Sequence, residues 1–209
     1  MGTVVRSRSE TTMHAKRLPA DFYERIKTRL HRRIGRELGM AYRVLDLGCG
    51  GCELARFLRK TCRQRVTGVD ISGTSLPRRD NPREGRTAMR CIEGNAARLT
   101  FLRDGSVDAV VTTWAVHEMK DPKAATREAH RVLRPGGKML IVDFPKGSLA
   151  KQLWGEAYLT ARAVAELLRQ AGFVRIRSRT TCEEQVIWAV GFRSPDRTFA
   201  AKATDELGK

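Results

Sequence analysis

The 209-residue sequence lacks any apolar run near the roughly 18 residues that a membrane-spanning helix needs. Its first ten residues also lack the apolar stretch of a secretory signal, because basic and hydroxyl side chains interrupt them. We therefore predict a cytoplasmic protein without a membrane span. A chain of this length can bury a core of its own, so we expect a single domain.

The five cysteines give little support for a metal site. Cys49 and Cys52 have C-x-x-C spacing, but no second such pair and no suitable histidine pair completes four zinc ligands. We predict no bound metal. An odd cysteine count in a cytoplasmic protein also favours free thiols over disulfides. Cys62, Cys91 and Cys182 are scattered, so no spacing supports methylation of arsenite held by Cys91 and Cys182.

Negative charge is scarce, since 23 acidic residues oppose 40 basic ones and the net charge at neutral pH is +17. The excess lies in two regions, with +7 over residues 1–43 and +8 over residues 56–103. Such a field attracts nucleic acid, an anionic ligand or an acidic membrane surface. The alternative is compositional, because arginine outnumbers lysine 30 to 10, a bias that a GC-rich genome also produces.

The chain contains an alternation of short apolar strands and amphipathic helices. Apolar residues at three- and four-residue spacing predict a helix over residues 19–38, ended by Gly39. Strands are expected at 43–47, 66–71, 87–93, 107–113, 138–144, 174–179 and 185–192, and further helices at 53–61, 122–133 and 160–171. This alternation is typical of an α/β fold with a doubly wound sheet, whose ligands bind beyond the carboxyl ends of the strands.

Three segments are expected along the chain. Residues 1–39 form a basic tail and the amphipathic helix, residues 40–193 form the ligand-binding domain, and residues 194–209 form a loose tail. Within the domain, residues 72–86 hold two prolines and two glycines, so we expect a loop or a broken helix there.

A glycine-rich loop follows the first expected strand and directly precedes a helix: Asp46-Leu-Gly48-Cys-Gly50-Gly51-Cys52. Glycine lets the backbone turn tightly and approach a ligand, and the helix amides beyond it can receive a carboxylate. Asp70 stands 24 residues after Asp46, at the end of the next strand, where its carboxylate can accept hydrogen bonds from ribose hydroxyls. The dinucleotide fingerprint G-x-G-x-x-G is absent, because Cys52 and Glu53 occupy the last part of its frame.

The loop, in the form Val44-Leu-Asp-Leu-Gly-Cys-Gly50, resembles motif I of the class I S-adenosylmethionine-dependent methyltransferases. Later segments resemble the following motifs in order: Val69–Ser72, Glu93–Leu99, Asp108–Met119, Arg131–Lys138 and Ile141–Phe144. The residues and the order of these motifs are similar to those of the methyltransferase-11 group, which includes the quinone C-methyltransferases. The resemblance extends over roughly residues 40–193. The resemblance implies a Rossmann-like sheet of about seven strands, mostly parallel with an antiparallel last strand. It also implies S-adenosylmethionine as cofactor and S-adenosylhomocysteine as product.

The same resemblance implies which residues would bind the methionine part of that cofactor. They are the loop residues Asp46, Gly48, Cys49 and Gly50. Thr113, at the end of the fourth strand, would touch the methionine end. Cys52 stands where the family commonly has glycine, and a side chain there would narrow the loop.

The resemblance also implies the residues of the adenosine end. Asp70 would hold the ribose and Ile71 would pack on the adenine. Asn95 stands where the family usually has Asp, and its carbonyl can still accept a hydrogen bond from the adenine amino group. Ala96 would offer its backbone N–H to the ring. The stretch 72–86 replaces the usual helix after the second strand, so the adenine-side wall departs from the family pattern.

Two residues just beyond the fourth strand, His117 and Glu118, are candidates for a general base. A base is optional, because in-line transfer mainly needs alignment of the reactants and exclusion of water. A structural histidine and an ordinary acid at a helix start are the alternatives.

Aromatic residues outside these motifs could line a pocket for the acceptor. Outside the motifs the candidates are Trp154 and Tyr158, with Tyr23 turned inward from the N-terminal helix, and Trp114 within the segment Asp108–Met119 joins them. That helix could fold over the cofactor mouth as a lid, while a plain packing helix and core packing of Trp154 are the alternatives.

Three functions remain open at this level. The first is methylation of an unidentified small-molecule acceptor. The second is methylation of RNA or protein, docked through the basic N-terminal helix and residues 72–103. Against it, Thr112-Thr-Trp-Ala115 stands where amino-group base methylation needs Asn/Asp-Pro-Pro-Tyr, and no Pro-Cys pair exists for cytosine attack. The third is a regulator that binds the cofactor without catalysis, which predicts no acceptor pocket.

Overall fold

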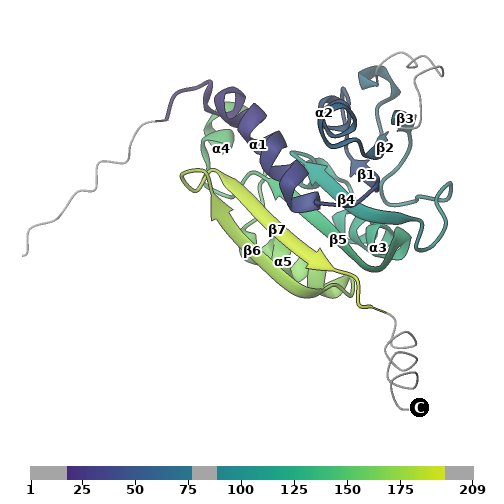
Figure 1. Cartoon of the computed structure of the whole chain (residues 1–209). Coiled ribbons are helices and arrows are strands. Elements are labelled where there is room, and N and C mark those ends of the chain that lie inside the picture. The colour runs from purple at the N-terminus through teal and green to yellow at the C-terminus, as the bar shows by residue number, and fades with distance from the viewer. Residues whose placement is uncertain (1–17, 77–88, 196–209) are drawn as a thin grey trace, which may run out of the picture.

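The computed structural model describes residues 18–76 and 89–195 (Figure 1). The expected N-terminal tail over residues 1–17, residues 77–86 of the expected loop and the C-terminal tail beyond residue 195 lie outside this part of the chain. Within it, no helix is long and apolar enough to cross a membrane.

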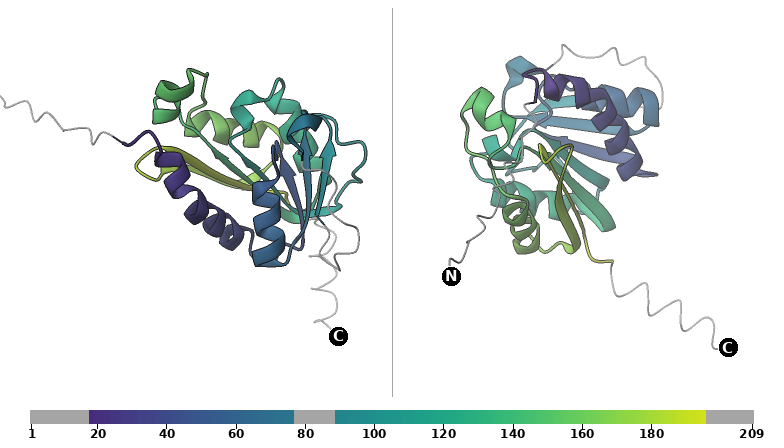
Figure 2. Two further views of the ribbon diagram at one scale, coloured as in Figure 1. Left: turned by 90° about the horizontal axis from the view of Figure 1, so that it is seen from above. Right: turned by 90° about the vertical axis from the view of Figure 1, so that its left-hand side faces the viewer.

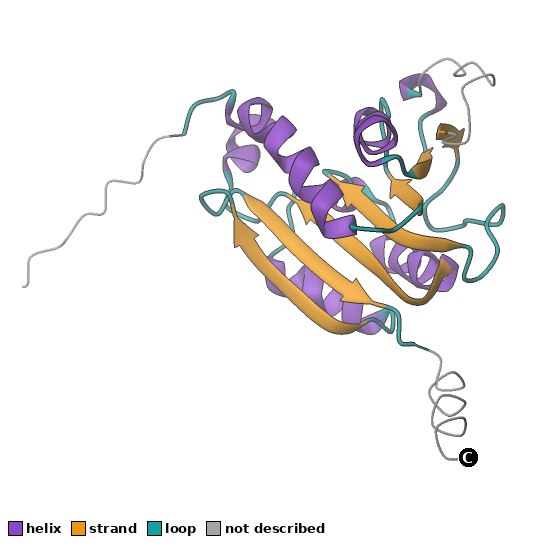
Figure 3. Ribbon diagram, in the orientation of Figure 1, coloured by secondary structure: helices purple, strands orange, loops and turns teal. Residues whose placement is uncertain are grey.

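Seven strands form one sheet in the order β3-β2-β1-β4-β5-β7-β6 (Figure 3). Their bounds are β1 Arg43–Leu47, β2 Arg65–Asp70, β3 Met89–Glu93, β4 Val107–Thr113, β5 Leu133–Asp143, β6 Val174–Thr181 and β7 Val186–Phe192. The first five strands run parallel, and β7 lies antiparallel between β5 and β6. The expected doubly wound, mostly parallel sheet with an antiparallel last strand is confirmed.

Helices cover both faces of this sheet (Figure 2). Their bounds are α1 Phe22–Leu38, α2 Glu53–Cys62, α3 Pro122–Val132, α4 Leu149–Trp154 and α5 Ala161–Gln170, with 3-10 turns η1 Gly73–Ser75 and η2 Val116–Glu118. Successive strand residues point to opposite faces, so Val44 belongs to the core under α1 and α2, and Leu45 to the core under α3 and α5. Both faces are therefore buried, which explains the continuous apolar strands.

The helix ends follow the expected chemistry. The Thr160 hydroxyl accepts a hydrogen bond from the Ala163 amide at 3.1 Å, which confirms the expected cap of α5. Gly39 has a positive φ of 60° and ends α1 as expected. The helix α1 starts at Phe22 rather than at Pro19, because the Pro19 carbonyl accepts from the Phe22 amide in a separate preceding turn.

Two elements differ from the expectation. The strand β5 begins at Leu133 rather than 138, because Leu133 already pairs with Val107 before the register shifts. Gly137 permits this irregularity, since a Cβ there would lie 2.8 Å from the Arg134 carbonyl oxygen. The short helix α4 was not expected at all; Gly155, with a φ of 77°, ends it.

Candidate active site

Two adjoining cavities open at the carboxyl ends of the parallel strands. The larger has a volume of about 980 Å³ and is bordered by the residues that end β1, β2, β3 and β4. The smaller has a volume of about 340 Å³ and lies toward α1 and α4. Lys27, Trp114 and Glu118 border both cavities. A ligand in one cavity can therefore contact a ligand in the other, at the edge of the sheet where doubly wound folds bind ligands.

The larger cavity gathers eight of the nine residues that the sequence assigns to the cofactor. They are Gly48, Cys49, Gly50, Asp70, Ile71, Asn95, Ala96 and Thr113. The ninth, Asp46, is buried and is not among the residues that line the cavity. The structure thus brings together residues that come from four separate strands.

The glycine loop after β1 is held against β2 by backbone hydrogen bonds. The amides of Gly48 and Cys49 both donate to the Val69 carbonyl, and the Gly50 amide donates to Asp70 Oδ2 at 2.8 Å. Gly48 has a φ of 69°, and a Cβ there would lie 2.3 Å from the Cβ of Ala115. Only glycine fits that position, so the close approach of this loop to a ligand is built into the sequence.

Asp46 carries an unpaired acidic group beside this loop. It is 1% exposed, and neither of its carboxylate oxygens has a hydrogen-bond partner among the described residues. Burial, reinforced by the negative charge of Asp70, raises the pKa of Asp46 to about 7. A cationic group bound nearby would relieve this cost. The ammonium of a methionine moiety is such a group, so the donor set fits S-adenosylmethionine.

The walls expected at the adenosine end are present in the larger cavity. Ile71 is 73% exposed, which leaves an apolar surface for a flat ring to cover. The side-chain oxygen of Asn95 accepts from the Ala97 amide at 2.8 Å, and its second lone pair remains for a ligand. The carboxylate of Asp70 accepts from the Ser72 amide at 3.0 Å as well as from the loop, so its position is fixed.

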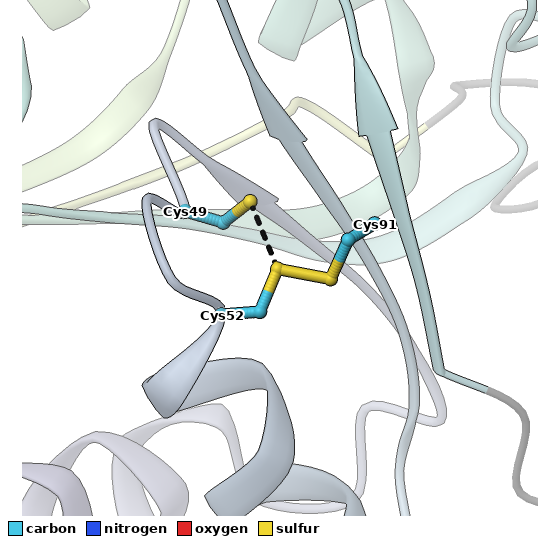
Figure 4. A group of neighbouring side chains, drawn as sticks. All are labelled: Cys49, Cys52 and Cys91. Carbon is cyan, nitrogen blue, oxygen red and sulfur yellow. Dashed lines mark hydrogen bonds between the residues drawn. A yellow bond between two sulfur atoms is a disulfide. The ribbon is translucent and has the colours of Figure 1, made fainter. Parts of the chain in front are cut away.

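Three cysteine side chains meet behind the loop (Figure 4). Cys52 and Cys91 form a disulfide, and the Cys49 sulfur lies 3.2 Å from that of Cys52. The expectation of free thiols is therefore wrong for this pair. The reason is Gly68, which pairs with Cys91 in the sheet and lacks the side chain that would fill the space between the sulfur atoms.

The same cluster corrects the expectation that Cys52 narrows the loop. Cys52 is fully buried in the left-handed conformation that glycine favours, with a φ of 58°, and it does not line the cavity. The sulfur atoms of Cys49, Cys52 and Cys91 lie within 4.8 Å of one another, so they would be close enough to share a soft metal ion only after reduction of the disulfide. Sequence spacing misses this group because Cys91 comes from a different strand.

The smaller cavity gathers every residue that the sequence assigns to the acceptor or to catalysis. They are Tyr23, Trp114, His117, Glu118, Trp154 and Tyr158. The cavity also contains residues that sequence reasoning missed: Glu24, Lys27, Phe144 and Glu156. Glu156 stands between two expected aromatic residues and could have been found by its position. Phe144 ends one of the motif segments, and its position there indicates no role in a cavity.

Aromatic rings in this cavity pack into one group. Trp114 is stacked on Phe144 with centroids 4.1 Å apart, and Tyr23 meets Phe144 edge-on at 4.7 Å. Trp154 is 51% exposed, with its ring 5.5 Å from that of Tyr23. It therefore forms a partly open wall of the cavity instead of packing in the core.

Tyr23 ties the first turn of α1 to this cavity. Its hydroxyl accepts from the Ala150 amide at 3.0 Å and donates to the Gln185 side-chain oxygen at 3.3 Å. The apolar face of α1 is buried along its whole length. The helix is thus a packing helix that also borders both cavities, and Tyr23 faces inward as expected.

His117 is held by Asp143 at the back of the smaller cavity. The imidazole Nδ1 lies 2.6 Å from Asp143 Oδ1, and the His117 amide donates to Asp143 Oδ2 at 3.0 Å. Nε2 lies 3.1 Å from Glu156 and 3.7 Å from Glu118. Burial lowers the pKa of His117, but the hydrogen bond and charge of Asp143, with the charges of both glutamates, outweigh it and raise the pKa overall.

This arrangement assigns the two nitrogens of His117 different tasks. With Asp143 accepting from Nδ1, Nε2 faces the two glutamates: it donates to Glu156 when the imidazole is protonated, and its lone pair is open to a ligand only when the imidazole is neutral. Nε2 can then accept a proton from a bound ligand. The ligand atoms of His117, Glu118 and Glu156 also lie within 4.8 Å of one another, so they are close enough to share a cation.

The sheet order, the glycine loop and the acid after β2 together define a class I S-adenosylmethionine-dependent methyltransferase fold. Residues 45–141 match the family described as a methyltransferase domain, the methyltransferase-11 group. This matched stretch resembles a methyltransferase-11 domain, a family whose cofactor is S-adenosylmethionine.

Relatives of known name agree with this assignment. The chain is 33% identical over 105 residues to the demethylmenaquinone methyltransferase of Thermus thermophilus, covering 49% of this chain and 47% of that protein. It is 32% identical over 150 residues to the malonyl-[acyl-carrier protein] O-methyltransferase of Methylococcus capsulatus, covering 65% and 53%. The chain spans about half the length of these two relatives.

A solved structure shows the same fold. It is that of a SAM-dependent methyltransferase from Archaeoglobus fulgidus, with a TM-score of 0.64 and 17% identity, covering 81% of this chain and 93% of that one.

Proposed function

We propose that the protein transfers a methyl group from S-adenosylmethionine to a small molecule bound in the smaller cavity. The observation that carries this proposal is the common border of the two cavities at Trp114 and Glu118. It allows an acceptor to reach the cofactor without leaving the protein. A volume of about 340 Å³ suits a small molecule.

One named relative supports a small acceptor, since it is called a demethylmenaquinone methyltransferase. A regulator without catalysis would need no second cavity, so the presence of one favours an enzyme. The alternative of RNA or protein methylation places docking on the N-terminal helix and residues 72–103. The walls of the smaller cavity itself carry three glutamates beside one lysine and one histidine, which disfavours a phosphate backbone there.

Different groups of residues at the larger cavity would each hold one part of the cofactor. The glycine loop would approach its methionine part closely, and Asp46, buried behind the cavity wall, would provide the counter-charge for the ammonium. Asp70 would bind the ribose, and Ile71 and Asn95 would face the adenine. When bound, S-adenosylmethionine supplies an electrophilic methyl carbon on a sulfonium.

The residues of the chain would align the acceptor with the cofactor, exclude water from the site and accept a proton. The stacked rings of Trp114 and Phe144 exclude water beside the shared border of the cavities. His117, held by Asp143, can accept a proton at Nε2 from an acceptor that must lose one. Asp143 is a positioning residue, because it acts only through the imidazole.

Calorimetric titration with S-adenosylhomocysteine tests the cofactor half of this proposal. We expect Asp70→Ala to weaken binding by at least tenfold, since the carboxylate is lost from the cavity wall and from the loop amide of Gly50. Asp104→Ala is the matched control, because Asp104 is exposed and pairs with Arg131. Equal affinity of the two variants would refute the site assignment.

A further inference from the structure

The smaller cavity has the opposite electrical character to the chain. Three glutamates line it, Glu24, Glu118 and Glu156, whereas the whole chain carries +17. The lysine among its described lining residues, Lys27, has its ammonium 2.5 Å from Glu53 and 3.7 Å from Glu24. The charge of Lys27 is thus already neutralised, and the surplus of carboxylate favours a cationic ligand.

Aromatic rings form the other walls of the smaller cavity. They belong to Tyr23, Trp114, Phe144, Trp154 and Tyr158. Neighbouring centroids lie between 4.1 Å and 5.8 Å apart, so the rings form one continuous surface. Ring faces attract ammonium groups through the negative face of the π system. Rings combined with carboxylates are therefore suited to an ammonium, while an anion would be repelled.

Tyr158 provides a polar atom that nothing in the described part of the chain satisfies. The side chain is only 8% exposed, and its hydroxyl is buried without a hydrogen-bond partner. Buried hydroxyls are normally paired, because leaving one unpaired costs free energy. A ligand N–H in this cavity would donate to that oxygen.

From these three observations we propose that the methyl acceptor is an amine, which binds as an ammonium in the smaller cavity. This inference rests on the proposed function. The carboxylates of Glu118 and Glu156 attract the charge, the rings surround the alkyl groups, and the cavity of about 340 Å³ limits the size.

The chemistry of an amine acceptor matches the groups in place. The ammonium transfers one proton to Nε2 of His117, which frees the nitrogen lone pair. That pair forms the new N–C bond to the methyl group, while the S–C bond breaks and its electrons stay on sulfur. The positive charge of the sulfonium thus ends on the methylated nitrogen. The product is again a cation, and the same walls accept it.

Selectivity for a cation can be measured without turnover. We would titrate the full chain, saturated with S-adenosylhomocysteine and with EDTA present, with choline and with 3,3-dimethylbutan-1-ol. The two probes have the same shape and differ in the charged nitrogen. We expect choline to bind at least tenfold more tightly. Glu156→Gln and Trp154→Leu should each reduce this preference by about threefold or more, while Glu166→Gln, on the exposed side of α5, should leave it unchanged.

The outcomes separate the two proposals. If S-adenosylhomocysteine binds but the probes bind equally or not at all, the amine assignment is wrong and the methyltransferase proposal stands. In a second titration without EDTA, binding of choline that occurs only with added divalent metal would also overturn it, since His117, Glu118 and Glu156 would then hold a metal ion. If S-adenosylhomocysteine itself fails to bind, the proposed function is refuted.

Discussion

The buried carboxylate of Asp46 makes the free protein less stable than it could be. Its pKa rises from 3.8 to about 7 on folding, because both oxygens are buried without partners. A raised native pKa means that the full stability is present below pH 3.8 and is lost as the pH rises toward 7. Three pKa units correspond to about 4 kcal/mol at about 1.36 kcal/mol per unit. We therefore expect Asp46→Asn to stabilise the free protein at pH 8.

Urea unfolding of wild type and Asp46→Asn at several pH values measures this effect. The stability difference should grow by about 2 to 3 kcal/mol in favour of the variant between pH 5 and pH 7, and then level off. The variant should also bind S-adenosylmethionine at least tenfold more weakly, because the counter-charge for the ammonium is gone. If the Asp46→Asn variant gains stability and loses affinity, the native carboxylate serves binding at a cost in stability.

Asp108→Asn is the control for this experiment. Burial alone would raise the pKa of Asp108, but hydrogen bonds from Arg43 and Arg134 lower it overall. Its contribution is present above the unfolded pKa and is lost only as the pH falls, so this variant should be less stable by a constant amount between pH 5 and 8. A pH-independent difference for Asp46→Asn over the same range would refute the reasoning.

Two further predictions concern the backbone. Gly48→Ala places a methyl group 2.3 Å from the Cβ of Ala115 at a φ of 69°, so S-adenosylhomocysteine affinity should fall by at least tenfold in calorimetry. Gly50→Ala, in the same loop at a φ of 47° but with nothing within 4 Å of the added Cβ, shows how much of the loss is backbone strain alone. Thr160→Ala removes the cap of α5 and should lower the free energy of unfolding by about 1 kcal/mol in urea, whereas Thr160→Ser should retain most of it. Equal stability of Ala and Ser at position 160 would contradict the capping role.

Much of the fold follows from local patterns in the sequence. Apolar runs locate most strands within a few residues, because a strand buried on both faces is continuously apolar. Glycine and threonine mark the ends of helices, because capping depends on residues next to the helix. The helix α4 cannot be predicted from apolar periodicity, since its six residues are too few to display a helical period. The start of β5 escapes it as well, because Leu133 is a strand residue only through its pairing with Val107.

The cysteine cluster shows where local reasoning fails. The spacing of Cys49 and Cys52 is visible in the sequence, but Cys91 joins them only because β3 pairs with β2 in one register. Gly68 then decides whether the sulfur atoms can meet, and its role depends on the absence of a side chain at that point of the sheet. A strand register is set by packing of the whole sheet, which no single segment specifies.

The sequence by itself indicated the cofactor class, because the segments around the glycine loop, Asp70 and Asn95 resemble, in order, the motifs of the S-adenosylmethionine-dependent methyltransferases. Only the tertiary structure decided the character of the acceptor cavity. Its carboxylates come from α1, η2 and the segment after α4, whereas the net charge of +17 left an anionic partner and a compositional arginine bias both open. Charge interactions weaken with distance and are screened by salt, so the sign inside a cavity depends on the residues that line it and not on the sum over the chain.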